Sequence, residues 1–88
     1  MDKAVEFRAA LYPNPNDGKF TMVVYSGLSG RITYSVISSL GETVMEGIMD
    51  ETDGRYEKEA DLKNVTGGIY FVRFSDGYRN YMTKFVKR

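Results

Sequence analysis

The side chains of this sequence that could carry out chemistry are mainly carboxylates, because histidine and cysteine are both absent. The densest acidic segment is Asp50–Asp53, and oxygen-rich turns can bind calcium, which takes six to eight oxygen ligands. The segment lacks the alternating ligand register and the closing glutamate of an EF-hand loop. Aspartate and glycine also form turns without any metal. We therefore expect a solvated acidic turn, with a calcium site at Asp50–Asp53 as the alternative.

Enzymatic activity is not expected. Without histidine and cysteine, the chain cannot form a Ser-His-Asp triad, a Cys-His dyad or a histidine-ligated zinc site. A glycosidase needs two carboxylates that flank the cleaved bond, and twelve acidic residues offer too many pairs for any one to be informative. We predict no catalytic residues, no cofactor and no metal, which favours a role in binding, structure or protein addressing.

Aromatic residues concentrate near the end of the chain, where they could stack on sugars or bases. Tyr70, Val72 and Phe74 fall on one face of a predicted strand, and a small domain needs aromatic bulk in its core. Core packing is therefore the favoured interpretation, and Phe71 and Arg73, on the opposite face, are the candidates for exposure. The aromatic set is Tyr70, Phe71, Phe74, Tyr78, Tyr81 and Phe85.

The net charge is zero, with 12 basic and 12 acidic residues, which argues against nucleic-acid binding. The charges are nevertheless unevenly distributed. Residues 42–62 hold eight acidic and two basic residues, whereas residues 63–88 hold six basic residues and one acidic residue. Either neighbouring strands carry complementary charge, or a basic terminal strip faces a partner. No apolar run approaches the ~20 residues of a membrane span, so no direct membrane insertion is expected.

The elements that position these residues are predicted to be β-strands, because apolar and polar residues alternate with a period of two. Tyr56–Leu62 shows the pattern well, and its three acidic residues are expected to face water. Val44 and Ile48 can share one face of their strand. Glycine-bearing turns separate most of the strands. The seven predicted strands cover residues 7–11, 20–25, 32–36, 43–49, 56–62, 69–74 and 78–87.

This pattern predicts one all-β domain over residues 1–88, with residues 1–9 as a lead-in. Short antiparallel strands at this spacing are typical of an immunoglobulin-like or fibronectin-like β-sandwich, here of about seven strands. The last strand, Tyr78–Lys87, mixes polar and apolar residues on both faces, which is typical of an edge strand. An open edge could accept a partner's strand or form a dimer.

The segment after the first strand is rich in turn-forming residues. Pro13 and Pro15 lack backbone donors, and we expect them to end the first strand and to force a crossing between sheets. Asn14 favours turn hydrogen bonds, and Gly18 supplies conformational freedom before the next strand. Further along the chain, Gly67-Gly68 allows a tight bend into the strand that contains Tyr70.

Three segments resemble motifs of a known protein family. Leu11–Phe20 contains the sequence Pro-Asn-Pro-Asn-Asp-Gly, Gly68–Phe74 has a glycine and a tyrosine before alternating apolar residues, and Lys84–Arg88 is a basic and apolar terminal strand. In this order and spacing, over about residues 10–88, they resemble the C-terminal sorting domains of type IX secretion. The family-motif residues with structural roles are Pro13, Asn14, Pro15, Gly18, Gly68 and Tyr70.

The resemblance implies that the domain directs an N-terminally fused cargo protein through the outer-membrane translocon of a Bacteroidetes-type bacterium. The cargo passes through the periplasm and reaches the cell surface or the medium. It also implies a sortase-like protease that removes the domain, with cleavage near or before the domain's N-terminus. We hypothesise a recognition strip with Phe85 or Val86 as apolar anchor and Lys87 as charge. The strip comprises Lys84, Phe85, Val86, Lys87 and Arg88.

Two other interpretations are open at this point. The chain could be an immunoglobulin-like accessory or carbohydrate-binding module of a secreted multidomain protein, which would expose aromatic residues on one face. It could also be a periplasmic interaction domain that acts by itself.

Overall fold

The computed structural model describes residues 7–26, 30–52, 55–62 and 65–88. These residues contain eight β-strands. None of them lies in a helix, so this part of the chain has no helix that could cross a membrane. The strands are β1 (Phe7–Tyr12), β2 (Lys19–Ser26), β3 (Thr33–Ser38), β4 (Thr43–Ile48), β5 (Asp50–Thr52), β6 (Arg55–Asp61), β7 (Gly68–Ser75) and β8 (Asn80–Lys87).

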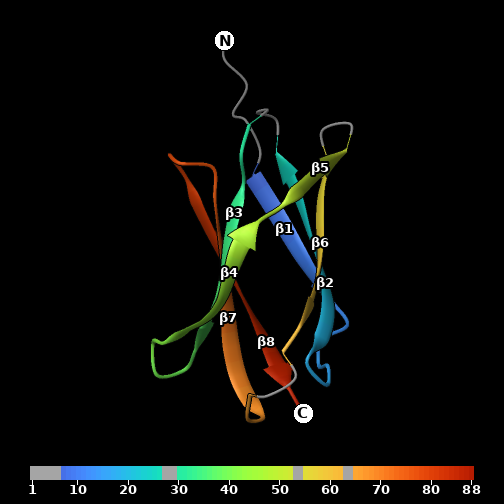
Figure 1. Cartoon of the computed structure of the whole chain (residues 1–88), viewed down its shortest axis with the longest axis vertical. Helices are drawn as coiled ribbons and strands as arrows, with labels where there is room; N and C mark the ends of the chain where they lie inside the picture. Colours follow the sequence, from blue (N-terminus) through green and yellow to red (C-terminus); the bar gives the residue numbers. More distant parts are fainter. Residues whose placement is uncertain (1–6, 27–29, 53–54, 63–64) are drawn as a thin grey trace.

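The strands form two four-stranded sheets, with the orders β1-β2-β6-β5 and β4-β3-β7-β8. All strand pairs within the sheets are antiparallel. The sheets pack face to face, and β1 at the edge of one lies beside β8 at the edge of the other (Figure 1). The predicted all-β sandwich is confirmed, and β8 is an edge strand of its sheet as expected.

The strand count differs from the expectation because residues 50–52, predicted as part of an acidic turn, form the short strand β5. This strand pairs with β6, with Glu51 opposite Tyr56. The chain passes from β4 in one sheet to β5 in the other at Met49, which is buried and donates its N–H to the Ile32 carbonyl at 2.8 Å. Burial of Met49 at this crossing keeps the chain extended where the local composition favoured a turn. Asp53 and Gly54 lie outside the described residues.

The core is formed by side chains that alternate inward from both sheets. Tyr70, Val72 and Phe74 are buried, as their spacing predicted. Phe85 is completely buried, with its ring centroid 4.6 Å from that of Phe20 and 5.6 Å from that of Tyr70. The other buried core residues are Met22, Val24, Ile32, Tyr34, Val36, Met49, Tyr56, Ala60 and Leu62.

The acidic and basic halves of the sequence lie in different places. The acidic strand β6 pairs with β2 and β5, whereas the basic residues of β7 and β8 belong to the other sheet. The acidic and basic segments therefore do not supply directly paired strands, although complementary charges do meet between the neighbouring strands β5 and β6 in the Asp50–Lys58 ion pair. Alternating apolar residues fix which face of each strand is buried, but they do not reveal which strands become neighbours.

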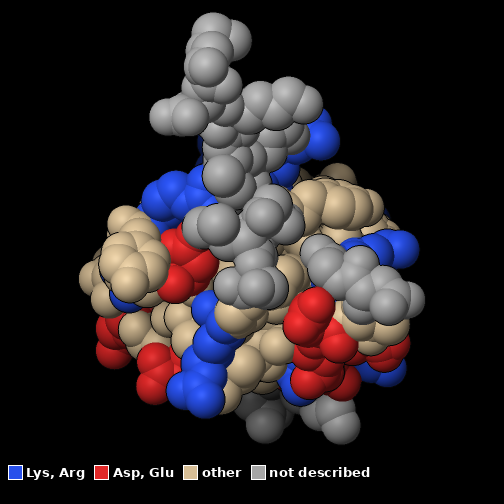
Figure 2. All heavy atoms as spheres, turned by 90° about the horizontal axis from the view of Figure 1, so that it is seen from above, with Lys and Arg blue, Asp and Glu red and all other residues tan. Residues whose placement is uncertain are grey.

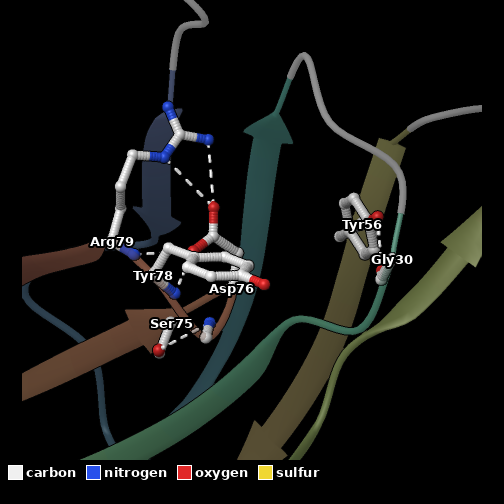
Figure 3. A network of polar contacts seen from close by, with 7 residues as sticks. Gly30, Tyr56, Ser75, Asp76, Tyr78 and Arg79 are labelled. Atoms are coloured by element: carbon white, nitrogen blue, oxygen red, sulfur yellow. Dashed lines mark hydrogen bonds and ion pairs between the residues drawn. The ribbon is translucent and has the colours of Figure 1, made fainter.

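The β7–β8 connection is organised by one carboxylate. Asp76 Oδ1 accepts hydrogen bonds from the backbone N–H groups of Arg79 at 2.7 Å and Tyr78 at 2.9 Å, while Oδ2 accepts from the Arg79 guanidinium (Figure 3). This turn takes up Tyr78 and Arg79, so β8 begins at Asn80 rather than at the predicted Tyr78. Nearby, the buried Tyr56 donates its hydroxyl to the Gly30 carbonyl at 2.6 Å.

Replacement of Phe85 by alanine tests the link between β8 and the core. Because Phe85 is completely buried against Phe20 and Tyr70, Phe85→Ala should lower the free energy of unfolding by about 3–5 kcal/mol in urea titrations. The neighbouring Val86→Ala is the matched control, because Val86 is 41% exposed and should cost less than about 1 kcal/mol. Equal effects of the two substitutions would contradict the assignment of Phe85 to the core.

The pH dependence of stability tests the β7–β8 turn. The backbone hydrogen bonds from Arg79 and then Tyr78 hold the pKa of Asp76 below its ordinary value of 3.8. The carboxylate form of Asp76 stabilises the folded state fully when the pH is above the pKa that Asp76 has in the unfolded chain. This stabilisation is lost as the pH falls through the lower pKa that Asp76 has in the folded protein. The stability advantage of the wild type over Asp76→Asn should therefore shrink below pH 3.8 in urea titrations. A difference that is constant with pH would argue against this role.

Candidate functional site at the end of the last strand

The last residues of β8 are held by two connections that are distant in sequence. The β1–β2 connection contributes Asn14, Asn16 and Gly18, and the segment before β7 contributes Gly67. We call these four residues, together with the strip Lys84–Arg88 that they hold, the terminal clasp. The clasp joins the first and the last of the three segments that carried the family resemblance.

Asn14 binds the outer edge of β8 with both ends of its side-chain amide. Its Nδ2 donates to the Lys84 carbonyl at 3.3 Å, and its Oδ1 accepts from the Val86 N–H at 3.0 Å. A side-chain amide offers a donor and an acceptor, as a peptide group does. Asn14 therefore substitutes for a residue of a neighbouring strand, although it is separated from these partners by 70 and 72 positions.

Asn16 continues the pairing with its backbone. Its N–H donates to the Val86 carbonyl at 3.0 Å, and its carbonyl accepts from the Arg88 N–H at 2.7 Å, which forms a short parallel bridge. The Asn16 side chain is buried and holds the loop: its Nδ2 donates to the Pro13 carbonyl, and its Oδ1 accepts from the Gly18 N–H. Asn16 thus pairs with β8 through its backbone, and its side chain fixes the turn that places it beside β8.

These contacts correct the expectation of an open edge. β8 lies at the edge of its sheet, but four outward backbone groups of Lys84–Arg88 are already bonded to Asn14 and Asn16. These groups are the Lys84 carbonyl, the Val86 N–H and carbonyl, and the Arg88 N–H. An incoming strand would first have to displace both asparagines. Strand addition at this stretch would therefore require the clasp to open, while a dimer through edge strands stays a prediction.

Two glycines let the chain approach the strip closely. Gly18 has a φ of +113°, which favours glycine as expected, and a Cβ at this position would lie 2.9 Å from the Leu62 carbonyl oxygen and 3.0 Å from Lys87 Cε. The stem of Lys87 therefore lies across Gly18. A Cβ on Gly67 would lie 3.1 Å from the Lys87 carbonyl oxygen. The sequence indicated a bend at Gly67-Gly68 but gave no sign of this contact with the strip.

The side chains of the strip differ in accessibility. Lys84 and Arg88 are exposed, Lys87 is half-buried, and Val86 is 41% exposed. Phe85 faces the core, so of the two proposed apolar anchors only Val86 can be reached from the surface. Alternation along β8 explains this division, because neighbouring residues of a strand face opposite sides of the sheet.

The prolines act differently from the expectation. β1 ends at Tyr12, directly before Pro13, as predicted. However, β1 and β2 are adjacent strands of one sheet, so the prolines do not force a crossing between sheets. The β1–β2 connection instead extends from its own sheet to β8, at the edge of the other sheet, and then continues into β2. Tyr70, from the remaining motif, donates its hydroxyl to the Thr66 carbonyl and so holds the loop that contains Gly67.

Among the described residues, which do not include Asp53 of the calcium candidate, the other candidate sites do not assemble. Asp50 lies in β5 and forms an ion pair with Lys58 at 3.5 Å, and no group of three acidic side chains that could hold a metal occurs among the described residues. Most of the aromatic set serves the core. Phe71 is half-buried, Arg73 is exposed, and Tyr78, in the β7–β8 turn, is 92% exposed.

The fold and the clasp together define a small β-sandwich module that presents the side chains of a fixed terminal strand. Residues 10–88 match the family model described as the secretion system C-terminal sorting domain, and the chain belongs to this family. The family indicates a C-terminal sorting signal for type IX secretion, which implies fusion to a cargo and export to the cell surface or the extracellular space. Comparison with curated proteins gave no match.

Substitutions at Asn14 test the clasp. Asn14→Ala removes both hydrogen bonds to β8 and should lower the free energy of unfolding by about 1–2 kcal/mol, whereas Asn14→Asp keeps an acceptor for Val86 and should cost less. Asn80→Ala, an exposed asparagine at the other end of β8, should change stability by less than about 0.5 kcal/mol. Urea titrations measure all three. An Asn14→Ala variant as stable as the wild type would show that the clasp contributes nothing.

Proposed function

We propose that the outer-membrane translocon recognises this domain through the outward-facing side chains of the strip, namely Lys84, Val86 and Arg88. The observation that carries the proposal is the hydrogen bonding of the strip's backbone. Because the Lys84 carbonyl, both Val86 backbone groups and the Arg88 N–H are already bonded to Asn14 and Asn16, side chains are the main groups that a receptor can contact here without breaking the clasp. Two cations around an exposed valine form a compact basic and apolar target.

The direction of β1 supports attachment of a cargo at the opposite end. β1 begins at the upper end of the sandwich and runs toward the end where β8 finishes (Figure 1). A cargo that precedes β1 therefore adjoins the end remote from the strip and leaves the strip accessible. Figure 2 looks onto this upper end, where basic and acidic side chains lie interspersed in the visible part.

The same geometry supports removal of the domain after transport. The fused protein crosses the periplasm, the translocon binds the strip, and a sortase-like protease cuts near or before the domain's N-terminus. A cut before β1, which begins at Phe7, leaves all eight strands and the clasp intact. The cargo is then released or retained at the cell surface.

Point substitutions test this proposal more sharply than a deletion. Removal of residues 84–88 would also remove Phe85 from the core and the partners of Asn14, so secretion could fail because of unfolding. The triple variant Lys84→Glu, Val86→Ser and Arg88→Glu spares the core. In a type IX-competent strain, a periplasmic reporter fused before the 88 residues should reach the medium at least about tenfold less when it carries this variant, as expected for loss of an interface hot spot.

A matched control changes the same kinds of side chain at the other end of the sandwich: Arg31→Glu, Arg55→Glu and Tyr25→Ser, all at exposed positions. This control should be secreted like the wild type. Normal secretion of the strip variant would refute recognition through these side chains.

A further inference from the structure

The four edge strands of the sandwich differ in how firmly the core holds them. They are β1 and β5 in one sheet and β4 and β8 in the other. β8 carries Phe85, which is completely buried. In β1, by contrast, no described side chain is buried, and Ala9 and Leu11 are the two that pack partly against the core. The attachment of β1 therefore depends on these two side chains and on backbone pairing with β2.

A strand attached in this way is expected to open before the interior of the sandwich does. Proteins open in contiguous units, and units with few buried apolar contacts open at the lowest free energy. β1 has a partner strand on one side only, so its detachment leaves β2 paired with β6 and leaves the buried core residues of the other strands in place. Detachment of β1 is therefore a smaller event than unfolding of the domain.

The terminal clasp follows β1 directly in the chain. β1 ends at Tyr12, and Asn14, which bonds to the Lys84 carbonyl and the Val86 N–H, lies two positions later. Two residues span at most about 7 Å, so β1 cannot move far from β2 without drawing Asn14 away from β8. The first strand and the end of the last strand are thus joined through the side chain of Asn14.

Asn16 is held more independently of β1. Its side chain accepts a hydrogen bond from the Gly18 N–H, and the Gly18 carbonyl accepts from the Leu62 N–H at 2.8 Å. These contacts tie Asn16 to the beginning of β2 and the end of β6, which are interior strands of their sheet. The clasp therefore has two parts: Asn14 depends on β1, whereas Asn16 is fixed to the interior of the sheet.

The two asparagines bond to β8 in the same arrangement. Asn16 bonds to the N–H and the carbonyl on either side of Lys87, as a parallel bridge does, and Asn14 bonds to those on either side of Phe85. A strand pairs with the edge of a sheet through groups of this kind. Loss of Asn14 alone would therefore leave one donor and one acceptor at the outer edge of β8.

We propose that β1 and Asn14 open as one unit, so that detachment of β1 releases the Lys84 carbonyl and the Val86 N–H while Asn16 stays in place. β1 thereby acts as a conformational switch for the strip. While β1 is paired with β2, the edge beside the strip is closed; when β1 detaches, the same stretch can accept a strand. The inference goes beyond the proposed function, because it concerns the conformation of the strip rather than its receptor.

The variant Leu11→Gly tests this coupling without changing a residue of the clasp. The substitution removes one of the two partly buried side chains of β1 and adds backbone freedom there, so β1 should detach more often. Amide hydrogen exchange of the 88-residue chain, measured by NMR, should then show the Val86 N–H exchanging about tenfold faster than in the wild type.

The matched control is Met45→Gly. Met45 is also partly buried against the core, but it lies on β4, at the opposite edge of the sheet that contains β8. This variant should accelerate exchange of the Val72 N–H, because Val72 is completely buried in the interior strand β7 and should exchange only when the domain unfolds. It should leave exchange at Val86 unchanged, because β4 stays paired when β1 detaches.

Two results overturn the inference. If Leu11→Gly leaves exchange at Val86 unchanged, the clasp opens independently of β1. If Met45→Gly accelerates Val86 as much as Val72, the Val86 N–H becomes free only when the whole domain unfolds. Should either glycine variant fail to fold, Leu11→Ala and Met45→Ala provide the same comparison with smaller accelerations. Because the measurement involves no secretion, its failure leaves the proposed function to be decided by the reporter assay alone.

Discussion

The hydrogen bonds between the two asparagines and the end of β8 are the constraint on which the rest of this account depends. An edge strand normally presents backbone groups that another strand can pair with. Here Asn14 and Asn16 pair with those groups, so the strand that carries the strip is fixed on both sides: by β7 within the sheet and by the β1–β2 connection outside it. If the strip is recognised while the domain stays folded, these bonds give it a defined conformation.

The core and the clasp support each other. Phe85 lies in the core beside Phe20 and Tyr70, so each of the three segments that characterise the family contributes one ring to a single cluster. Burial of Phe85 turns Lys84 and Val86 outward, because neighbouring residues of a strand alternate between faces. The pattern of the strip thus follows from packing: one residue anchors the strand, and the residues beside it remain available to a partner.

The sequence was sufficient to predict the sandwich, the edge position of β8 and most of the core, because these depend on local alternation and composition. It missed β5, since acidic residues that favour a turn are extended there by the burial of Met49. It also missed the clasp, because an asparagine that favours a turn looks the same whether its amide bonds to its own loop or to a strand 70 positions away. The pairing of distant segments has no local signature.

Amide hydrogen exchange at the edge of β8 tests the central claim most directly. The account predicts that the N–H groups of Val86 and Arg88 exchange slowly, because they donate to Asn14 and Asn16, whereas the N–H of Met82, further up the same edge, exchanges quickly. If Val86 and Arg88 exchanged as quickly as Met82, the clasp would not be closed in solution, and the strip would be an open edge.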